Sequence, residues 1–146
     1  GVGASGLLAL DFLYKSSRIG IPAFYHSDAH TNLATASLLG PEDIVIAISY
    51  SGETLETVLA AKAAKERGSK VIAITQANRN TLSRLADYPL YIPSEEREFR
   101  VGAMTSRTSG LLILDLLYLG IAKHDPERTQ ENLRQTRELI RAFQRE

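Results

Sequence analysis

A strand, a hydroxyl-rich turn and a helix follow one another near the middle of the chain, and this order constrains the fold more than any other feature. The apolar run 44–48 leads into Ser-Tyr-Ser-Gly-Glu-Thr at 49–54, and a helical pattern begins at Leu55. The N-terminus of a helix carries unpaired backbone N–H groups and the positive end of the helix dipole. Hydroxyl groups and a glycine at such a point predict a cradle for an anion, above all a phosphate monoester. The alternative is a helix cap without a ligand, provided by Ser51 or Thr54.

Apolar runs alternate with helical patterns along the chain, which predicts an α/β fold with a parallel sheet covered by helices on both faces. The runs 44–48 and 71–74 are apolar on both faces, as expected for central strands of such a sheet. A hydrophobic fraction of 44% is enough for the core of one domain. We expect strands at 23–26, 44–48, 71–74 and 90–92, and helices at 7–19, from Asp28 or Thr31 to 39, at 55–67, 81–86 and 105–123, and from Asp125 onward.

The helix predicted at 105–123 is apolar nearly all round, with leucine or isoleucine at eight positions between 111 and 121. A helix of this kind is buried on more than one side, so it is either central in the domain or part of a subunit interface. The helix after Asp125 carries an apolar stripe that includes Ile140 and Phe143. We therefore expect a homodimer or a higher homo-oligomer.

Charge and composition argue against several classes of protein. Basic and acidic residues number 17 each, so the bulk charge indicates neither a nucleic-acid binder nor a membrane-surface protein. There is no cysteine, which excludes disulfides and thiolate metal sites and is compatible with a reducing compartment. No apolar run approaches the roughly 20 residues that span a bilayer, and residues 1–6 lack the features of a signal peptide. We expect a cytoplasmic protein with no membrane partner.

Two further patterns suggest a cofactor or a metal, but neither is complete. The glycines within residues 1–6 have the spacing of a dinucleotide site, yet Asp28 is the nearest acidic residue and does not end a well-placed second strand. His26, Asp28 and His30 would share one face of an extended strand, but Asp28 is better placed as the start of a helix. We therefore expect neither a cofactor nor a metal.

Several motifs in one order resemble the SIS (sugar isomerase) domain over nearly the whole chain: the Gly-rich start 1–6, the turn 49–54, the strand 71–75 and Thr-Ser-Arg at 105–107. The stretches 46–52 and 107–117 are similar to the effector domain of RpiR-like bacterial transcription regulators. The resemblance implies a three-layer α-β-α sandwich, with residues 1–146 as one sugar-phosphate-binding domain. It also implies a first strand and a helix-turn-helix domain before Gly1, and contact with DNA only through that domain.

The resemblance also implies which residues of the turn bind the phosphate of a sugar effector. By the motif, Ser49, Ser51 and Thr54 hold the phosphate, with Gly52 and the N–H of Glu53 nearby. A carboxylate in this place competes with an anion. We therefore expect the side chain of Glu53 to point away, across a subunit interface.

The remaining expected site residues come from three other segments. Ser5, at the start of the first helix, is expected to face the same crevice, and Glu98 or Arg100 is expected to contact sugar hydroxyls. Arg107 is either a bidentate phosphate donor or the partner of an acid. The implied function is a sugar-phosphate sensor in a transcription regulator, which binds without catalysis. The alternative is an aldose–ketose isomerase with Glu98 as base, although the charged segment around Glu98 also fits a solvated loop.

Overall fold

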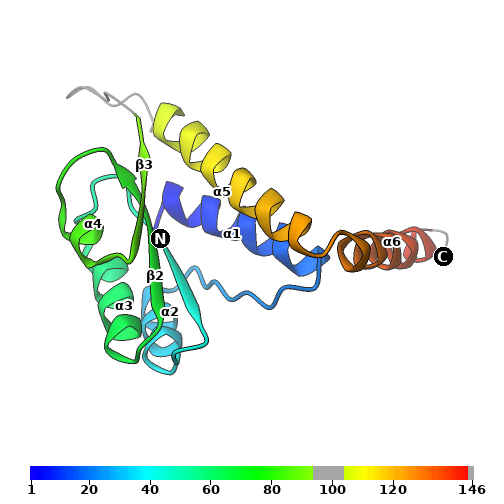
Figure 1. Cartoon of the computed structure of the whole chain (residues 1–146), viewed down its shortest axis with the longest axis horizontal. Coiled ribbons are helices and arrows are strands. Elements are labelled where there is room, and N and C mark those ends of the chain that lie inside the picture. The colour runs from blue at the N-terminus through cyan, green and yellow to red at the C-terminus, as the bar shows by residue number, and fades with distance from the viewer. Residues whose placement is uncertain (94–103, 145–146) are drawn as a thin grey trace.

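A three-stranded parallel sheet, in the order β1-β2-β3, forms the middle layer of the protein (Figure 1). The computed structural model describes residues 1–93 and 104–144. The strands are β1 (Ile44–Ile48), β2 (Lys70–Gln76) and β3 (Tyr88–Ile92). In the register of the sheet Ile48 pairs with Ile74, and Ile74 pairs with Leu90. The predicted parallel α/β architecture is confirmed.

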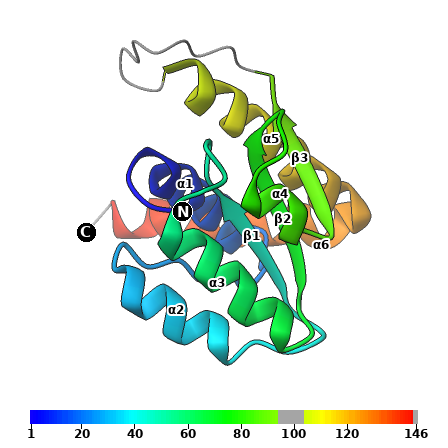
Figure 2. The same cartoon turned by 90° about the vertical axis from the view of Figure 1, so that its left-hand side faces the viewer.

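Helices lie on both sides of the sheet, which is seen nearly edge-on in Figure 1. One face is covered by α1 (Ala4–Arg18) and α5 (Met104–His124). The other face is covered by α3 (Leu55–Glu66) and the short α4 (Thr81–Leu85), and α2 (Ala29–Ser37) packs on the outside of α3 (Figure 2). The result is the three-layer arrangement that was expected.

Side chains along each strand alternate between the two faces of the sheet, and this divides the core into two clusters. Because successive side chains of a strand point to opposite faces, Ile48 and Ala47 belong to different clusters. The cluster under α1 and α5 consists of large side chains: Leu8, Ile48, Ile74, Ile92 and Leu114. The cluster under α3 and α4 is built mostly from small ones: Ala47, Ala61, Val71, Ala73 and Leu82. The small side chains let α3 approach the sheet closely.

The strand that was predicted at 23–26 is not formed. This segment pairs with no strand of the described sheet, and the side chain of Asn32 takes the place of a neighbouring strand. Asn32 Oδ1 accepts from the backbone N–H of His26 at 3.0 Å, and its Nδ2 donates to the His26 carbonyl at 2.5 Å. The backbone of His26 is therefore satisfied locally.

Asp28 starts α2, as one of the two expected caps. Its carboxylate accepts from the backbone N–H of Thr31 at 2.7 Å, and the helix begins at Ala29. The alternation of His26, Asp28 and His30 is broken at this point because Asp28 is the last extended residue and His30 already lies in the helix. Within residues 1–93 and 104–144, no group of His, Asp and Glu side chains is placed to hold a metal ion.

The two C-terminal helices both expose apolar side chains. On α5, Leu114 is buried against the sheet, while Leu112, Leu116 and Leu119 lie on the open side of the helix. The helix α6 (Pro126–Phe143) begins with Asp125 as cap and proline in its first turn, as predicted. It extends away from the sheet (Figure 1), so that Ile140 and Phe143 are exposed. In the described part of the chain, no helix combines the length and the apolar character needed to cross a bilayer.

Candidate functional site

The turn at residues 49–54 lies at the carboxyl end of β1, at the edge of the sheet where open α/β folds bind ligands. Backbone hydrogen bonds join it to β2. The N–H of Ser49 donates to the Ile74 carbonyl at 3.0 Å, and the N–H of Gln76 donates to the Tyr50 carbonyl at 2.9 Å. The start of the turn is thus held to the central strand of the sheet.

Hydroxyl groups organise the inside of the turn. The Ser49 hydroxyl is buried and lies 2.8 Å from the Thr54 hydroxyl and 3.5 Å from the Ser51 hydroxyl. It also accepts from the N–H of Gly52 at 3.2 Å, while the Ser51 hydroxyl accepts from the N–H of Glu53 at 3.2 Å. Thr54 is the N-cap residue of α3, but its side chain makes no capping bond. The capping role that Thr54 had in the alternative interpretation is therefore not seen.

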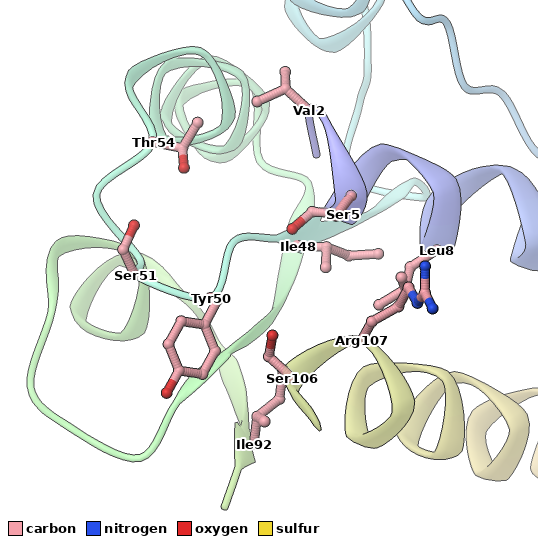
Figure 3. Close-up of a pocket in the computed structure, with 11 residues that line it drawn as sticks. Val2, Ser5, Leu8, Ile48, Tyr50, Ser51, Thr54, Ile92, Ser106 and Arg107 are labelled. Atoms are coloured by element: carbon pink, nitrogen blue, oxygen red, sulfur yellow. The ribbon is translucent and has the colours of Figure 1, made fainter. Parts of the chain in front are cut away.

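A cavity of about 210 Å³ opens beside this turn (Figure 3). Ser51 and Thr54 line it on one side, Ser5 from the first turn of α1 lines another, and Ser106 and Arg107 come from the first turn of α5. The rest of the wall is largely apolar, formed by Val2, Ala4, Leu8, Ile48, Tyr50 and Ile92.

The N-termini of three helices meet at the cavity, because α1, α3 and α5 each contribute a residue of their first turn or cap to its wall. Each brings the positive end of its dipole and backbone N–H groups. The described first turns of α1 and α5 carry no acidic side chain, and α3 has Glu56 in its first turn. The arrangement favours a ligand with one strongly anionic end and a body that contacts hydroxyls and apolar side chains.

The structure brings four of the predicted site residues to the cavity and places three others, Ser49, Gly52 and Glu53, in the turn but not on the cavity wall. Ser5, Ser51, Thr54 and Arg107 line the wall. Arg107 is exposed, and in Figure 3 its guanidinium lies beside Leu8 and points away from Ser51 and Thr54. Two predicted residues, Ser49 and Gly52, are buried within the turn itself. Both Glu98 and Arg100, the two residues expected to contact sugar hydroxyls, lie outside the described residues.

Ser106 and Tyr50 line the cavity but were absent from the predicted site. Ser106 is buried at the first turn of α5, opposite the turn at 49–54 (Figure 3). A signal for it exists in the sequence, since a hydroxyl residue beside Arg107 opens a long helix. The sequence does not show that α5 begins at the same cavity as α3.

Glu53 points away from the cavity wall, but its partner belongs to the same chain. Its carboxylate Oε1 accepts from the backbone N–H of Thr81, the first residue of α4, at 2.7 Å. The side chain and the backbone N–H of Thr81, with Arg84 nearby, hold the pKa of Glu53 below its ordinary value. The expectation that this side chain reaches across a subunit interface is wrong, because Glu53 ties the turn to α4.

Replacing Glu53 by glutamine is expected to lower the free energy of unfolding at neutral pH, since the negative charge at the N-terminus of α4 is lost. The folded-state pKa lies below the ordinary 4.5, so the carboxylate stabilises the fold above about pH 4.5. That contribution declines as the pH falls through the lowered pKa. Urea denaturation of wild type and Glu53→Gln at a series of pH values should show their difference shrinking in acid. A difference that is constant with pH would contradict the ion–dipole interaction.

Comparison with known proteins assigns the chain to a family. The model of the SIS domain family matches residues 1–120. An uncharacterised HTH-type transcriptional regulator of Caldanaerobacter subterraneus is 39% identical over 140 residues, which are 96% of this chain and 50% of the relative. This chain spans about half the length of the curated relatives it matches, and those relatives are named HTH-type transcriptional regulators.

Solved structures agree with this assignment. The Vibrio vulnificus NanR protein complexed with ManNAc-6P is 31% identical, with a TM-score of 0.89 over 98% of this chain and 54% of that one. The sugar isomerase domain of an RpiR transcription factor from Sphaerobacter thermophilus is 27% identical, with a TM-score of 0.81 over 94% of this chain and 75% of that one. The match of the family model, the identity to the relatives and the shared fold lead to one conclusion, that this chain belongs to the SIS domain family.

Proposed function

We propose that residues 1–146 form the effector domain of a DNA-binding transcriptional regulator, and that the domain senses a sugar phosphate. The observation that carries this proposal is the cavity where three helix N-termini and the hydroxyls of Ser5, Ser51, Thr54 and Ser106 converge. The relatives named as HTH-type regulators support the regulatory context, and the NanR complex with ManNAc-6P supports a phosphosugar ligand. Such a regulator acts in the cytoplasm, where its DNA is.

The phosphate in this proposal binds at the first turn of α3. Ser51 and Thr54 supply hydroxyls to the phosphate, and the first turn of α3 supplies backbone N–H groups and the dipole. Ser49 and Gly52 shape the turn from behind. The sugar extends toward Ser5 and the start of α5, where Ser106 and Arg107 lie and where Glu98 precedes the helix along the chain.

Transmission to DNA requires a second copy of the chain. The exposed side of α5, with Leu112, Leu116 and Leu119, is an apolar surface that a partner subunit would cover. A sugar phosphate that binds one dimer arrangement more tightly than another shifts the population toward it. The DNA-binding domain would lie in the part of the protein outside this chain.

Sugar phosphates are expected to raise the unfolding temperature of the domain. A panel of hexose 6-phosphates, N-acetylhexosamine 6-phosphates and pentose 5-phosphates should contain at least one stabilising ligand. At 100 times its dissociation constant, that ligand adds about 2.7 kcal/mol to the free energy of unfolding. The shift should vanish in the double variant Ser51→Ala plus Thr54→Ala, as measured by differential scanning fluorimetry.

The matched control is Ser17→Ala plus Ser37→Ala, which removes two hydroxyls that donate only to carbonyls of their own helices. This control variant should show the same rise in unfolding temperature with the ligand as wild type does. Absence of any shift in the folded wild type would contradict the sensor and favour an assembly module.

Incubation with the stabilising compound, followed by NMR, tests whether the domain converts that compound chemically. Its conversion would contradict a purely sensing role and favour an isomerase, whose turnover Glu98→Gln should abolish.

A further inference from the structure

The short helix α4 lies directly behind the turn at 49–54, and its N-cap residue Asn80 is packed onto Gly52. Gly52 has φ of +70°, and a Cβ built on it would overlap the side-chain amide of Asn80. The backbone N–H of Leu82 donates to the Gly52 carbonyl at 3.0 Å. Together with the bond from Thr81 to Glu53, these contacts join the beginning of α4 to the second half of the turn.

A buried chain of hydrogen bonds joins α4 to the first half of the turn as well. Asn80 Oδ1 accepts from the N–H of Ser83 at 2.8 Å, and its Nδ2 donates to Thr75 Oγ1 at 3.0 Å. Thr75 Oγ1 in turn donates to the Tyr50 carbonyl at 3.1 Å. Asn80 is 3% exposed and Thr75 is fully buried. The polar atoms of this hydrogen-bond network are therefore shielded from water. Asn80 Nδ2 also donates to Asn78 Oδ1 at 2.9 Å, whereas Thr75 provides the link to Tyr50.

Neither residue reaches the ligand cavity. Of the described residues, those that line the cavity include Ser51 and Thr54 but not Thr75 or Asn80. Thr75 donates to the backbone carbonyl of Tyr50, whereas the Asn80 amide occupies the space in which a Cβ of Gly52 would lie. Any influence on a ligand must therefore pass through the shape of the turn.

We propose that Thr75 and Asn80 are positioning residues that preorganise the anion-binding turn. The proposal rests on the proposed function and adds an explanation of what holds the anion-binding turn rigid before a ligand binds. A turn whose hydroxyls and N–H groups are already in place loses little conformational entropy when a phosphate binds. Gly52 is needed in this arrangement because it leaves room for the Asn80 amide.

Thr75 is the better residue to test, since Asn80→Ala would also remove the cap of α4. Thr75→Val keeps the shape of the side chain and removes the hydroxyl, whereas Thr75→Ser keeps the hydroxyl. Ser69→Ala is the control for general stability. Its hydroxyl is also buried and donates to the Gly40 carbonyl at 2.7 Å, but it precedes β2 at the opposite end of the sheet from the turn.

Two measurements on these variants test the proposal. Hydrogen exchange by NMR in the ligand-free protein follows the amides of Gln76 and Leu82, which donate to Tyr50 and Gly52. Titration with N-acetylmannosamine 6-phosphate and with inorganic phosphate follows affinity. Thr75→Val should speed both exchange rates and weaken binding by about fivefold, the equivalent of one hydrogen bond. Thr75→Ser and Ser69→Ala should bind as wild type does.

Wild-type affinity in Thr75→Val would overturn the proposal, and so would an equal loss of affinity in Ser69→Ala. A wild-type protein that binds neither probe would instead contradict the choice of ligand in the proposed function. Hydrogen exchange is measured without a ligand, so it shows whether Thr75 holds the turn even if wild type binds neither probe. Unchanged protection of Gln76 and Leu82 in Thr75→Val would overturn the positioning role.

Discussion

Replacing Gly52 by alanine is expected to destabilise the domain by about 2–5 kcal/mol. Two costs combine at this position. The backbone has φ of +70°, which costs an L-residue about 1–2 kcal/mol, and the new methyl group overlaps the Asn80 amide, which adds about 1–3 kcal/mol of overpacking. Urea denaturation monitored by circular dichroism gives the change in the free energy of unfolding.

Gly3→Ala is the matched control for this variant. Gly3 also has positive φ, +57°, but a Cβ built there meets nothing within 4 Å. Only the backbone cost should remain in this variant. Gly3 has ψ of −131°, outside the region that L-residues reach at positive φ, so its backbone cost is a high reference value. An unchanged free energy of unfolding in Gly52→Ala would contradict the expected backbone and packing costs at Gly52. Where Gly52→Ala still folds at low temperature, we also expect loss of the thermal shift with sugar phosphates, because Ser51 and Thr54 are displaced with the turn.

Leu114→Ala is expected to cost about 2–5 kcal/mol, because it removes a fully packed side chain from the core between α5 and the sheet. Leu116→Ala is the matched control, the same change two residues further along the same helix. Leu114 is 1% exposed and Leu116 is 60% exposed. In a monomer the second substitution should change the free energy of unfolding by less than about 0.5 kcal/mol. Urea denaturation at low protein concentration measures the change in the free energy of unfolding for each of the two variants.

Light scattering on Leu116→Ala then tests the proposed dimer. If α5 meets a partner subunit through its exposed side, the variant should dissociate at concentrations where wild type is dimeric. Circular dichroism should show that its fold is unchanged. A monodisperse wild-type monomer at high concentration would contradict the homodimer and with it the proposed route of transmission.

Local signals in the sequence are sufficient for most of the elements. The cap at Asp28, the proline after Asp125 and the apolar run at 44–48 each act within a few residues, so their consequences can be predicted without the rest of the fold. The segment 23–26 shows where this fails. A strand needs the backbone of a neighbour, and here Asn32 satisfies His26 first.

The residues of the candidate site also fall into two groups, those that local sequence signals predict and those that only contacts between distant segments bring in. Ser51 and Thr54 were predictable because a strand, a turn and a helix place them in sequence at a helix N-terminus. Ser106 joins them only because α5 packs beside α1 and starts at the same edge of the sheet.

The partner of Glu53 and the support of Gly52 were likewise decided by tertiary structure. Thr81 is 28 residues from Glu53, and Thr75 is 25 residues from the Tyr50 carbonyl that it holds. Sequence by itself determined most of the elements and the hydroxyl turn, because these follow from backbone preference and periodicity over short spans. The family was indicated by the resemblance of its ordered motifs to the SIS domain. The packing of α4 and α5 decided what surrounds the turn, because contacts between distant segments depend on how whole elements fill the space around the sheet.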